Sequence, residues 1–172
     1  LRLLDGFRLE RHGRPVNVAG RSQRLLALLA LHGGVPRTVI AGTLWPEVPE
    51  GRARASVRSA VCEIQRIAPG LVHSSPHDLD LSADVGVDVV EVLELTASAV
   101  RARGDPTADD VPDQVAEFLP GRRLAGPLLP GWTDDWLLAE IERIQQLRVH
   151  ALDIWAARLL AVAAFPLALA VA

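Results

Sequence analysis

The chain has 172 residues, an apolar content of 49% and a charged content of 23%, which is the composition of an ordinary globular protein. The formal charge of −3 at pH 7 excludes a protein that is basic throughout, and a single cysteine excludes an intramolecular disulfide bond. That cysteine count favours a reducing cytoplasm, and Arg2, Asp5 and Arg8 interrupt any apolar run of the kind found in signal peptides.

The charges are unevenly distributed along the chain. Residues 1–75 contain eleven arginines and five acidic residues, a net charge of +6, whereas residues 76–172 contain seven arginines and sixteen acidic residues, a net charge of −9. A basic half joined to an acidic half indicates a module that binds a polyanion, such as nucleic acid, beside a module with another role. Chance segregation of charge between two domains is the alternative.

The N-terminal region predicts strands followed by a helix. Apolar side chains alternate at Leu3, Phe7 and Leu9, and a turn at 12–15 leads into a second short strand with Val16 and Val18. A leucine-rich helix is then expected over residues 21–32. Ser22 or Gly20 would begin it, and the pair Gly33-Gly34 would end it as a glycine C-cap.

The stretch 37–66 predicts two helices joined by a short proline-containing loop. Thr38 is expected to cap the first helix, which would stop at Pro46 because proline lacks the N–H that continues a helix. The second helix is expected to begin near Pro49 and Glu50, since proline and a carboxylate both suit a first helical turn.

The second of these helices is amphipathic and cationic. At about 100° per residue, its apolar stripe consists of Ala53, Val57, Ala60, Val61, Ile64 and Ala68. The opposite face carries Arg52, Ala55, Ser59, Cys62, Glu63 and Arg66, with Arg54, Arg58 and Gln65 on one flank. Such a helix suits the major groove of DNA, where arginine contacts phosphates and guanine edges. A surface helix with solvated arginines explains the same pattern.

A hairpin and a helical region follow. Odd-numbered apolar residues between Leu71 and Val89 predict a β-hairpin with its turn at 74–77. Strands, three helices and a hairpin, in that order, are typical of a winged helix-turn-helix. We therefore expect a mainly α fold with small antiparallel β elements, divided into domains at 1–88 and 89–172.

The second domain is predicted to be a tetratricopeptide-like array of helices. Thr133 is expected to cap a long helix, and the apolar end of the chain indicates that further helices would follow. The expected segments are a helix over 89–103, an acidic loop over 104–113, a helical piece over 115–119, a long helix from 133 to about 163 and a break at 164–166.

Several segments resemble the AfsR/SARP family of transcriptional activators. In the first domain they are RSQRLLALLALHGG, PRTVIAGTLWPE and RARASVRSAV, and in the second LLPGWTDDWLLAEIERIQQLRVHALD, which is similar to the family's bacterial transcriptional activation domain. The combination covers nearly the whole chain. The resemblance implies an OmpR-type winged helix, a cytoplasmic, nucleoid-associated regulator that binds direct repeats at promoters, and recruitment of RNA polymerase.

In such a regulator, residues 52–66 would enter the major groove of double-stranded DNA. Arg52, Ser59, Cys62, Glu63 and Arg66 would face bases, whereas Arg54 and Arg58 would contact phosphates. Ser22, Gln23 and Arg24 would contact the DNA backbone from the start of the first helix. The loop 46–49 matches the position where OmpR-type domains touch RNA polymerase, and the helical domain would mediate homodimerisation or polymerase contact.

Two departures from the family favour an alternative function, a protein-interaction module that no longer binds DNA strongly. The family commonly has basic residues near position 63, and its wing is basic, whereas this chain has Glu63 and the acidic segment 76–80. We expect Glu63 to limit DNA affinity, so that Glu63→Arg would tighten binding to nonspecific DNA, whereas binding to a specific site would weaken if Glu63 reads a cytosine.

Other functions find little support. His73 and His77 lie near Asp78 and Asp80, but no Cys/His set completes a zinc or nickel site. Neither a GxGxxG nor a P-loop motif occurs, so we expect no cofactor, no metal and no enzyme activity. The apolar run at 159–172 is shorter than the roughly 18–20 residues that span a bilayer, so we expect no membrane insertion.

Overall fold

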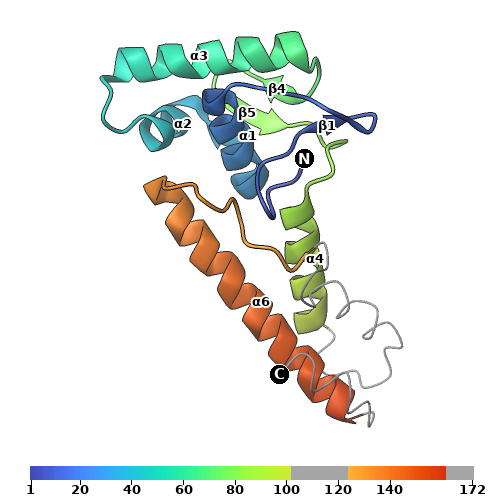
Figure 1. Ribbon diagram of the computed structural model, residues 1–172. Coiled ribbons are helices and arrows are strands. Elements are labelled where there is room, and N and C mark those ends of the chain that lie inside the picture. The colour runs from blue at the N-terminus through green and yellow to red at the C-terminus, as the bar shows by residue number, and fades with distance from the viewer. Residues whose placement is uncertain (102–123, 162–172) are drawn as a thin grey trace. The chain divides into compact units, whose positions relative to one another are not determined.

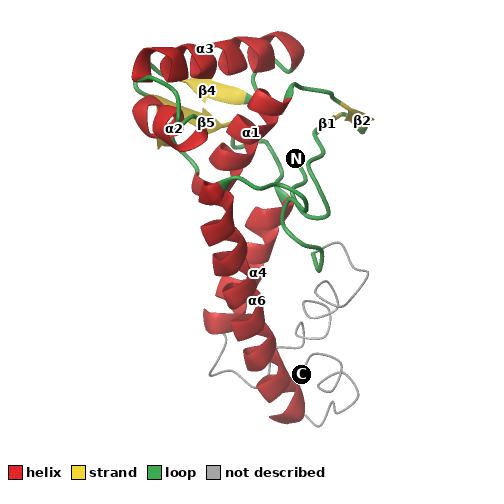
Figure 2. Cartoon of the chain, turned by 60° about the vertical axis from the view of Figure 1, so that its left-hand side comes forward, coloured by secondary structure: helices red, strands yellow, loops and turns green. Residues whose placement is uncertain are grey.

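The computed structural model describes residues 1–101 and 124–161, and these are mainly helical with small antiparallel sheets (Figures 1 and 2). The chain divides into two compact units, Leu1–Leu3 with Phe7–Val87 and Leu4–Gly6 with Asp88–Ala172. The described helices are α1 (Gly20–His32), α2 (Arg37–Leu44), α3 (Glu50–Ile67), α4 (Asp88–Arg101) and α6 (Asp135–Ala161). The described strands are β1 (Glu10–Arg11), β2 (Arg14–Pro15), β3 (Val35–Pro36), β4 (Val72–Ser74) and β5 (Asp78–Leu81).

The first unit is built around α1. Leu25 and Leu26 are fully buried, and α1 packs against α2, α3 and β5. The helix predicted over 21–32 is confirmed, and it begins at Gly20, so Ser22 lies in its first turn and does not cap it. Its glycine C-cap is also confirmed, because Gly33 has a φ of 72° and its N–H bonds to the carbonyl of Leu29. Glycine reaches this left-handed conformation without the steric cost of a Cβ atom.

A three-stranded antiparallel sheet completes the first unit. Its strand order is β3-β5-β4, so Leu79 on the central strand pairs with Val35 on one side and Ser74 on the other. Figures 1 and 2 both show α3 alongside the β4–β5 hairpin, and α3 also packs against α1 and α2. The predicted hairpin is confirmed, but its pattern ends at Leu81; the later valines lie in a loop and in α4.

The helix pair α2–α3 follows the proline signals of the sequence. α2 ends at Leu44, just before Trp45 and Pro46, and α3 begins directly after Pro49. The predicted apolar stripe of α3 is buried. The predicted cap is wrong, however, because α2 already begins at Arg37 and Thr38 lies inside its first turn.

The N-terminal strands differ from the prediction. The chain reverses at Asp5-Gly6, whose φ angles are 59° and 119°, and Arg2 and Arg8 exchange backbone hydrogen bonds of 2.8 and 2.9 Å. The reversal replaces the predicted continuous strand. A short hairpin, β1–β2, follows, and the second strand ends at Pro15 instead of extending through Val18.

In the second unit, α4 packs against α6, and Figure 1 shows the two helices running in the same direction. Arg148 of α6 is buried, and its guanidinium donates to the carbonyls of Leu124 at 2.7 Å and Gly126 at 2.9 Å. The N-terminal segment joins this unit because the Leu4 N–H donates to the carboxylate of Asp88 at 2.9 Å.

The long helix α6 begins at Asp135, two residues after the predicted cap Thr133. The acidic loop at 104–113, the piece at 115–119 and the break at 164–166 lie outside the described residues. In residues 1–101 and 124–161, no helix has both the length and the apolar character needed to cross a membrane.

Replacing Trp155 by alanine is expected to lower the free energy of unfolding by about 3–5 kcal/mol, because removal of a fully buried indole leaves a cavity. Urea unfolding followed by circular dichroism measures this loss. Leu160, with an exposed fraction of 55%, is the matched control, and its replacement by alanine is expected to cost less than about 0.5 kcal/mol. Equal losses for the two variants would contradict the different burial of the two side chains.

Candidate nucleic-acid interface

The outward face of α3 is a row of arginines separated by small side chains. The exposed residues on it include Arg52, Arg54, Arg58, Ser59, Cys62 and Arg66, all of them predicted site residues. Their exposure follows from the apolar stripe, because burying that stripe against α1, α2 and β4 turns the opposite face outward. The face therefore presents four guanidinium groups on one rigid element.

A groove lies between α3, the start of α2 and the β4–β5 turn, with a volume of about 750 Å³. We call it the α3 groove; it is lined by Pro36, Arg37, Thr38, Arg54, Val57, Arg58, Val61, Cys62, Gln65, Ser74, Ser75, Pro76, His77 and Asp78. Arg54, Arg58 and Cys62 belong both to the groove and to the arginine face. Arg52, Ser59 and Arg66 lie on the arginine face outside the groove lining.

Arg37 is a groove residue that the sequence did not reveal. Its guanidinium donates to the carbonyl of Ser75 at 2.9 Å and to the hydroxyl of Ser74 at 2.6 Å, while its backbone N–H donates to the carbonyl of His77. These bonds tie the hairpin turn to the start of α2. No local pattern marks such a residue, because its partners lie 37 or more positions away in the sequence.

The turn itself is held by a serine. The hydroxyl oxygen of Ser75 accepts hydrogen bonds from the N–H groups of His77 at 3.1 Å and Asp78 at 2.8 Å. Ser75 also donates its own N–H to the carbonyl of Asp78. The hairpin therefore presents a defined edge to the α3 groove, with its acidic residues on β5.

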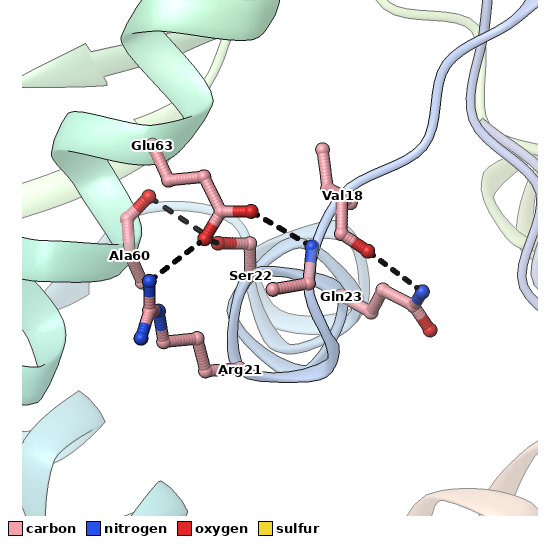
Figure 3. A network of polar contacts seen from close by, with 7 residues as sticks. Val18, Arg21, Ser22, Gln23, Ala60 and Glu63 are labelled. Carbon is pink, nitrogen blue, oxygen red and sulfur yellow. Dashed lines mark hydrogen bonds and ion pairs between the residues drawn. The ribbon is translucent and has the colours of Figure 1, made fainter.

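Glu63 does not face outward with the arginines (Figure 3). Its Oε1 accepts a hydrogen bond from the Ala19 N–H at 2.8 Å, and its Oε2 accepts one from the Ser22 hydroxyl at 3.0 Å. Oε2 also lies 3.3 Å from the guanidinium of Arg21. The prediction that this carboxylate points outward is wrong, because the start of α1 offers it donors and a cation.

The contacts of Glu63 with the start of α1 change the effect on DNA binding that is expected of Glu63→Arg. An arginine at position 63 would lie beside Arg21 and the positive end of the α1 dipole, where cations are unfavourable. A tightening of DNA binding by Glu63→Arg is therefore no longer expected.

The three polar residues predicted at the start of α1 are used within the fold. Ser22 is fully buried, so its predicted contact with the DNA backbone is wrong. The side-chain amide of Gln23 donates to the carbonyl of Val18 at 3.0 Å. The guanidinium of Arg24 donates to the carbonyl of Leu44 at 2.8 Å and lies over the ring of Trp45, 6.0 Å from its centroid. These side chains are engaged because α1 packs against α2, α3 and β5.

The electrostatics of this surface are dominated by the arginines. Arg54 forms an exposed ion pair with Glu50 one turn earlier, at 2.8 Å, and pairs of this kind contribute only about 0.3–0.5 kcal/mol. The hydrogen bond from Ala19 lowers the pKa of Glu63 below its ordinary value of 4.5, and Ser22 and Arg21 lower it further, whereas burial opposes them. Glu63 is therefore a carboxylate at neutral pH, with its charge directed at α1.

Among the described residues, this surface has no arrangement of side chains suited to metal or thiol chemistry. In the part of the chain that the structure describes, no group of three or more His, Cys, Asp or Glu side chains is placed to hold a metal ion. His73 and Asp80 are opposite one another on β4 and β5. Cys62 is a free, exposed cysteine at the edge of the α3 groove.

The stability contributed by Glu63 is expected to depend on pH. Because its pKa is lower in the folded state, the carboxylate stabilises the fold above pH 4.5, and this contribution is lost as the pH falls through 4.5 toward the folded-state pKa. Urea unfolding of wild type and Glu63→Gln, from about pH 7 to about pH 3, should show two stabilities that converge in acid. A constant difference across the series would contradict a charge-dependent contribution.

No family model matches the chain, and no curated protein matches it. What the molecule itself supplies is a rigid arginine face, a cationic groove beside it and an acidic residue directed inward.

Proposed function

We propose that the chain is a DNA-binding transcription regulator, without enzyme activity, whose first unit is a winged helix-turn-helix domain. The element order supports this proposal: α2 and α3 would be the helix-turn-helix, with α3 as the recognition helix, and the β4–β5 hairpin would be the wing. The observation that carries it is the outward face of α3, where four arginines are exposed while the carboxylate of Glu63 is turned to α1.

The dimensions of this face suit duplex DNA. Arg52 and Arg66 are fourteen positions apart in one helix, which corresponds to about 21 Å at 1.5 Å per residue. The residues between them on the outermost face include Ser59 and Cys62, whose small side chains allow close approach to base edges. Arginines at both ends of such a helix can contact guanines or phosphates of one major groove.

The α3 groove supports a second set of contacts. Arg54 and Arg58 line its α3 side, and His77 lines its hairpin side. A DNA backbone that follows this groove would bring phosphates to both sides, and each neutralised phosphate releases counterions from the duplex. Asp78 also lines the groove and opposes these contacts, so we expect modest affinity with a strong dependence on salt.

The α2–α3 loop and the second unit would act in regulation. Between α2 and α3 the chain exposes Pro46, Glu47 and Pro49, which would form the contact with RNA polymerase at promoters. The second unit would be a tetratricopeptide-like activation module that mediates homodimerisation on direct repeats. α4 and α6 run in the same direction, which supports a tetratricopeptide-like module because equivalent helices of successive repeats run parallel. We place the regulator in the cytoplasm, on the nucleoid.

A protein-interaction module is the second candidate function. The observation that favours it is the exposure of Asp78 and Asp80 on β5, together with the exposed apolar side chain of Val39 on α2. An acidic hairpin beside apolar surface suits a basic protein partner better than it suits DNA. The two functions differ in the element that binds the partner: the arginines of α3 bind DNA in the first, whereas the acidic hairpin binds a basic protein in the second.

Binding to a short duplex is expected to fall steeply with salt, and the arginines of α3 should set the slope. Arg58→Ala is expected to weaken binding and to reduce the slope of log K against log salt by about one unit, because one phosphate contact is lost. Arg66→Ala is expected to weaken binding to a preferred promoter sequence by about 1–3 kcal/mol. Fluorescence anisotropy over a salt series measures both effects.

The control is Arg143→Ala, which removes an arginine of α6 that is ion-paired with Glu140 in the second unit. Its affinity should equal that of wild type. A salt-independent signal, or an equal loss in Arg58→Ala and Arg143→Ala, would contradict binding through α3.

A further inference from the structure

An acidic residue of another helix, Glu63 of α3, lies at the start of α1. The N-cap residue Ala19 has no side-chain acceptor, and α1 has no acidic residue in its first turn. A helix start with free N–H groups and a positive dipole end favours an anion. Here the anion is the carboxylate of Glu63, held by the N–H of Ala19, the hydroxyl of Ser22 and the guanidinium of Arg21 (Figure 3).

We infer that Glu63 is a positioning residue, which fixes the arginine face of α3 by anchoring that helix through its carboxylate to the start of α1. The effect on DNA rests on the proposed function, whereas the anchoring itself does not. Glu63 lies one turn before Arg66 and one turn after Ser59 on the same helix. A shift of α3 at this point would therefore displace the side chains that face DNA.

The anchor joins α3 at two successive points. The Ser22 hydroxyl, which donates to Glu63, also lies 3.4 Å from the carbonyl oxygen of Ala60, almost one turn earlier on α3. The side chain of Glu63 is 12% exposed and its hydrogen bond with the Ser22 hydroxyl is partly buried. Two contacts spaced along the helix restrain its rotation as well as its distance from α1.

Positioning and simple electrostatics predict opposite effects on DNA binding. Glu63→Gln removes one negative charge from α3, which by itself would strengthen attraction to phosphates. The same change removes the charged part of the anchor and frees α3 to shift. Glu50→Gln is the matched control, because it removes one negative charge from the same helix at an exposed side chain that contacts only Arg54 among the described ion pairs.

The binding experiment compares the full chain and the two variants on one duplex by fluorescence anisotropy. Glu50→Gln is expected to bind as tightly as wild type or more tightly. Glu63→Gln is expected to bind about threefold or more weakly, since displaced contacts lose strength steeply with distance. A Glu63→Gln variant that binds as tightly as Glu50→Gln would overturn the positioning role.

A chemical rescue tests the anchor without DNA. Glu63→Ala leaves the donors at the start of α1 without their carboxylate, and formate can replace it. Melting temperatures are compared in sodium formate and in sodium chloride at equal ionic strength. Formate is expected to raise the melting temperature of Glu63→Ala more than that of wild type or Glu50→Ala. An equal response of all three proteins would overturn the anchor.

The binding experiment tests the proposed function, and the formate rescue tests the anchoring of α3 to α1. Absence of DNA binding by wild type would contradict the proposed function, while formate rescue would still support the anchor. If Glu63→Ala does not fold even with formate, the melting temperature of Glu63→Gln tests the anchor instead. A melting temperature about 5 °C below that of Glu50→Gln supports the anchor, and an equal melting temperature overturns it.

Discussion

The position that we infer for the arginine face of α3 depends on the contact between the carboxylate of Glu63 and the start of α1. Glu63 accepts a hydrogen bond from the N–H of the N-cap residue Ala19, and it places a negative charge beside the positive end of the α1 dipole and Arg21. Hydrogen bonds to charged groups contribute about 1.5–3 kcal/mol each, more than neutral ones. The same interaction keeps the carboxylate of Glu63 away from the outer surface of α3, where the arginines lie. One contact therefore joins the two helices and removes a negative charge from the proposed interface.

The arginines of this unit divide into two groups with different roles. Arg24 and Arg37 bond to backbone carbonyls, and so fix the α2–α3 loop and the hairpin turn, respectively. Arg52, Arg58 and Arg66 are exposed on α3. Guanidinium groups suit both roles, because they make several directed hydrogen bonds to carbonyl groups and also bind phosphate. Hydrogen bonds to neutral carbonyls leave the charges of Arg24 and Arg37 in place, so both still contribute to the net charge of +6 over residues 1–75 while they hold the fold together.

Local patterns predicted the elements, whereas contacts between distant residues were not predictable. The apolar stripe of α3, the glycine at the end of α1 and the hairpin turn follow from periodicity and backbone preferences within a few positions. Glu63 was assigned to the outer face from helix geometry alone, but its long side chain reaches across to residues 41 and 44 positions earlier. The pairing of Leu4 with Leu128, far along the sequence, has no local signal either.

The central claim, that the arginine face of α3 and the adjoining groove bind duplex DNA, is tested most directly by an NMR titration. Amide resonances of the full chain would be followed while a short duplex is added at low salt. The account predicts that the largest shifts occur in residues 52–66 and in the hairpin turn around Ser75, with little change in α4 and α6. Shifts confined to α4 and α6, or no shift in α3 at saturating duplex, would contradict it.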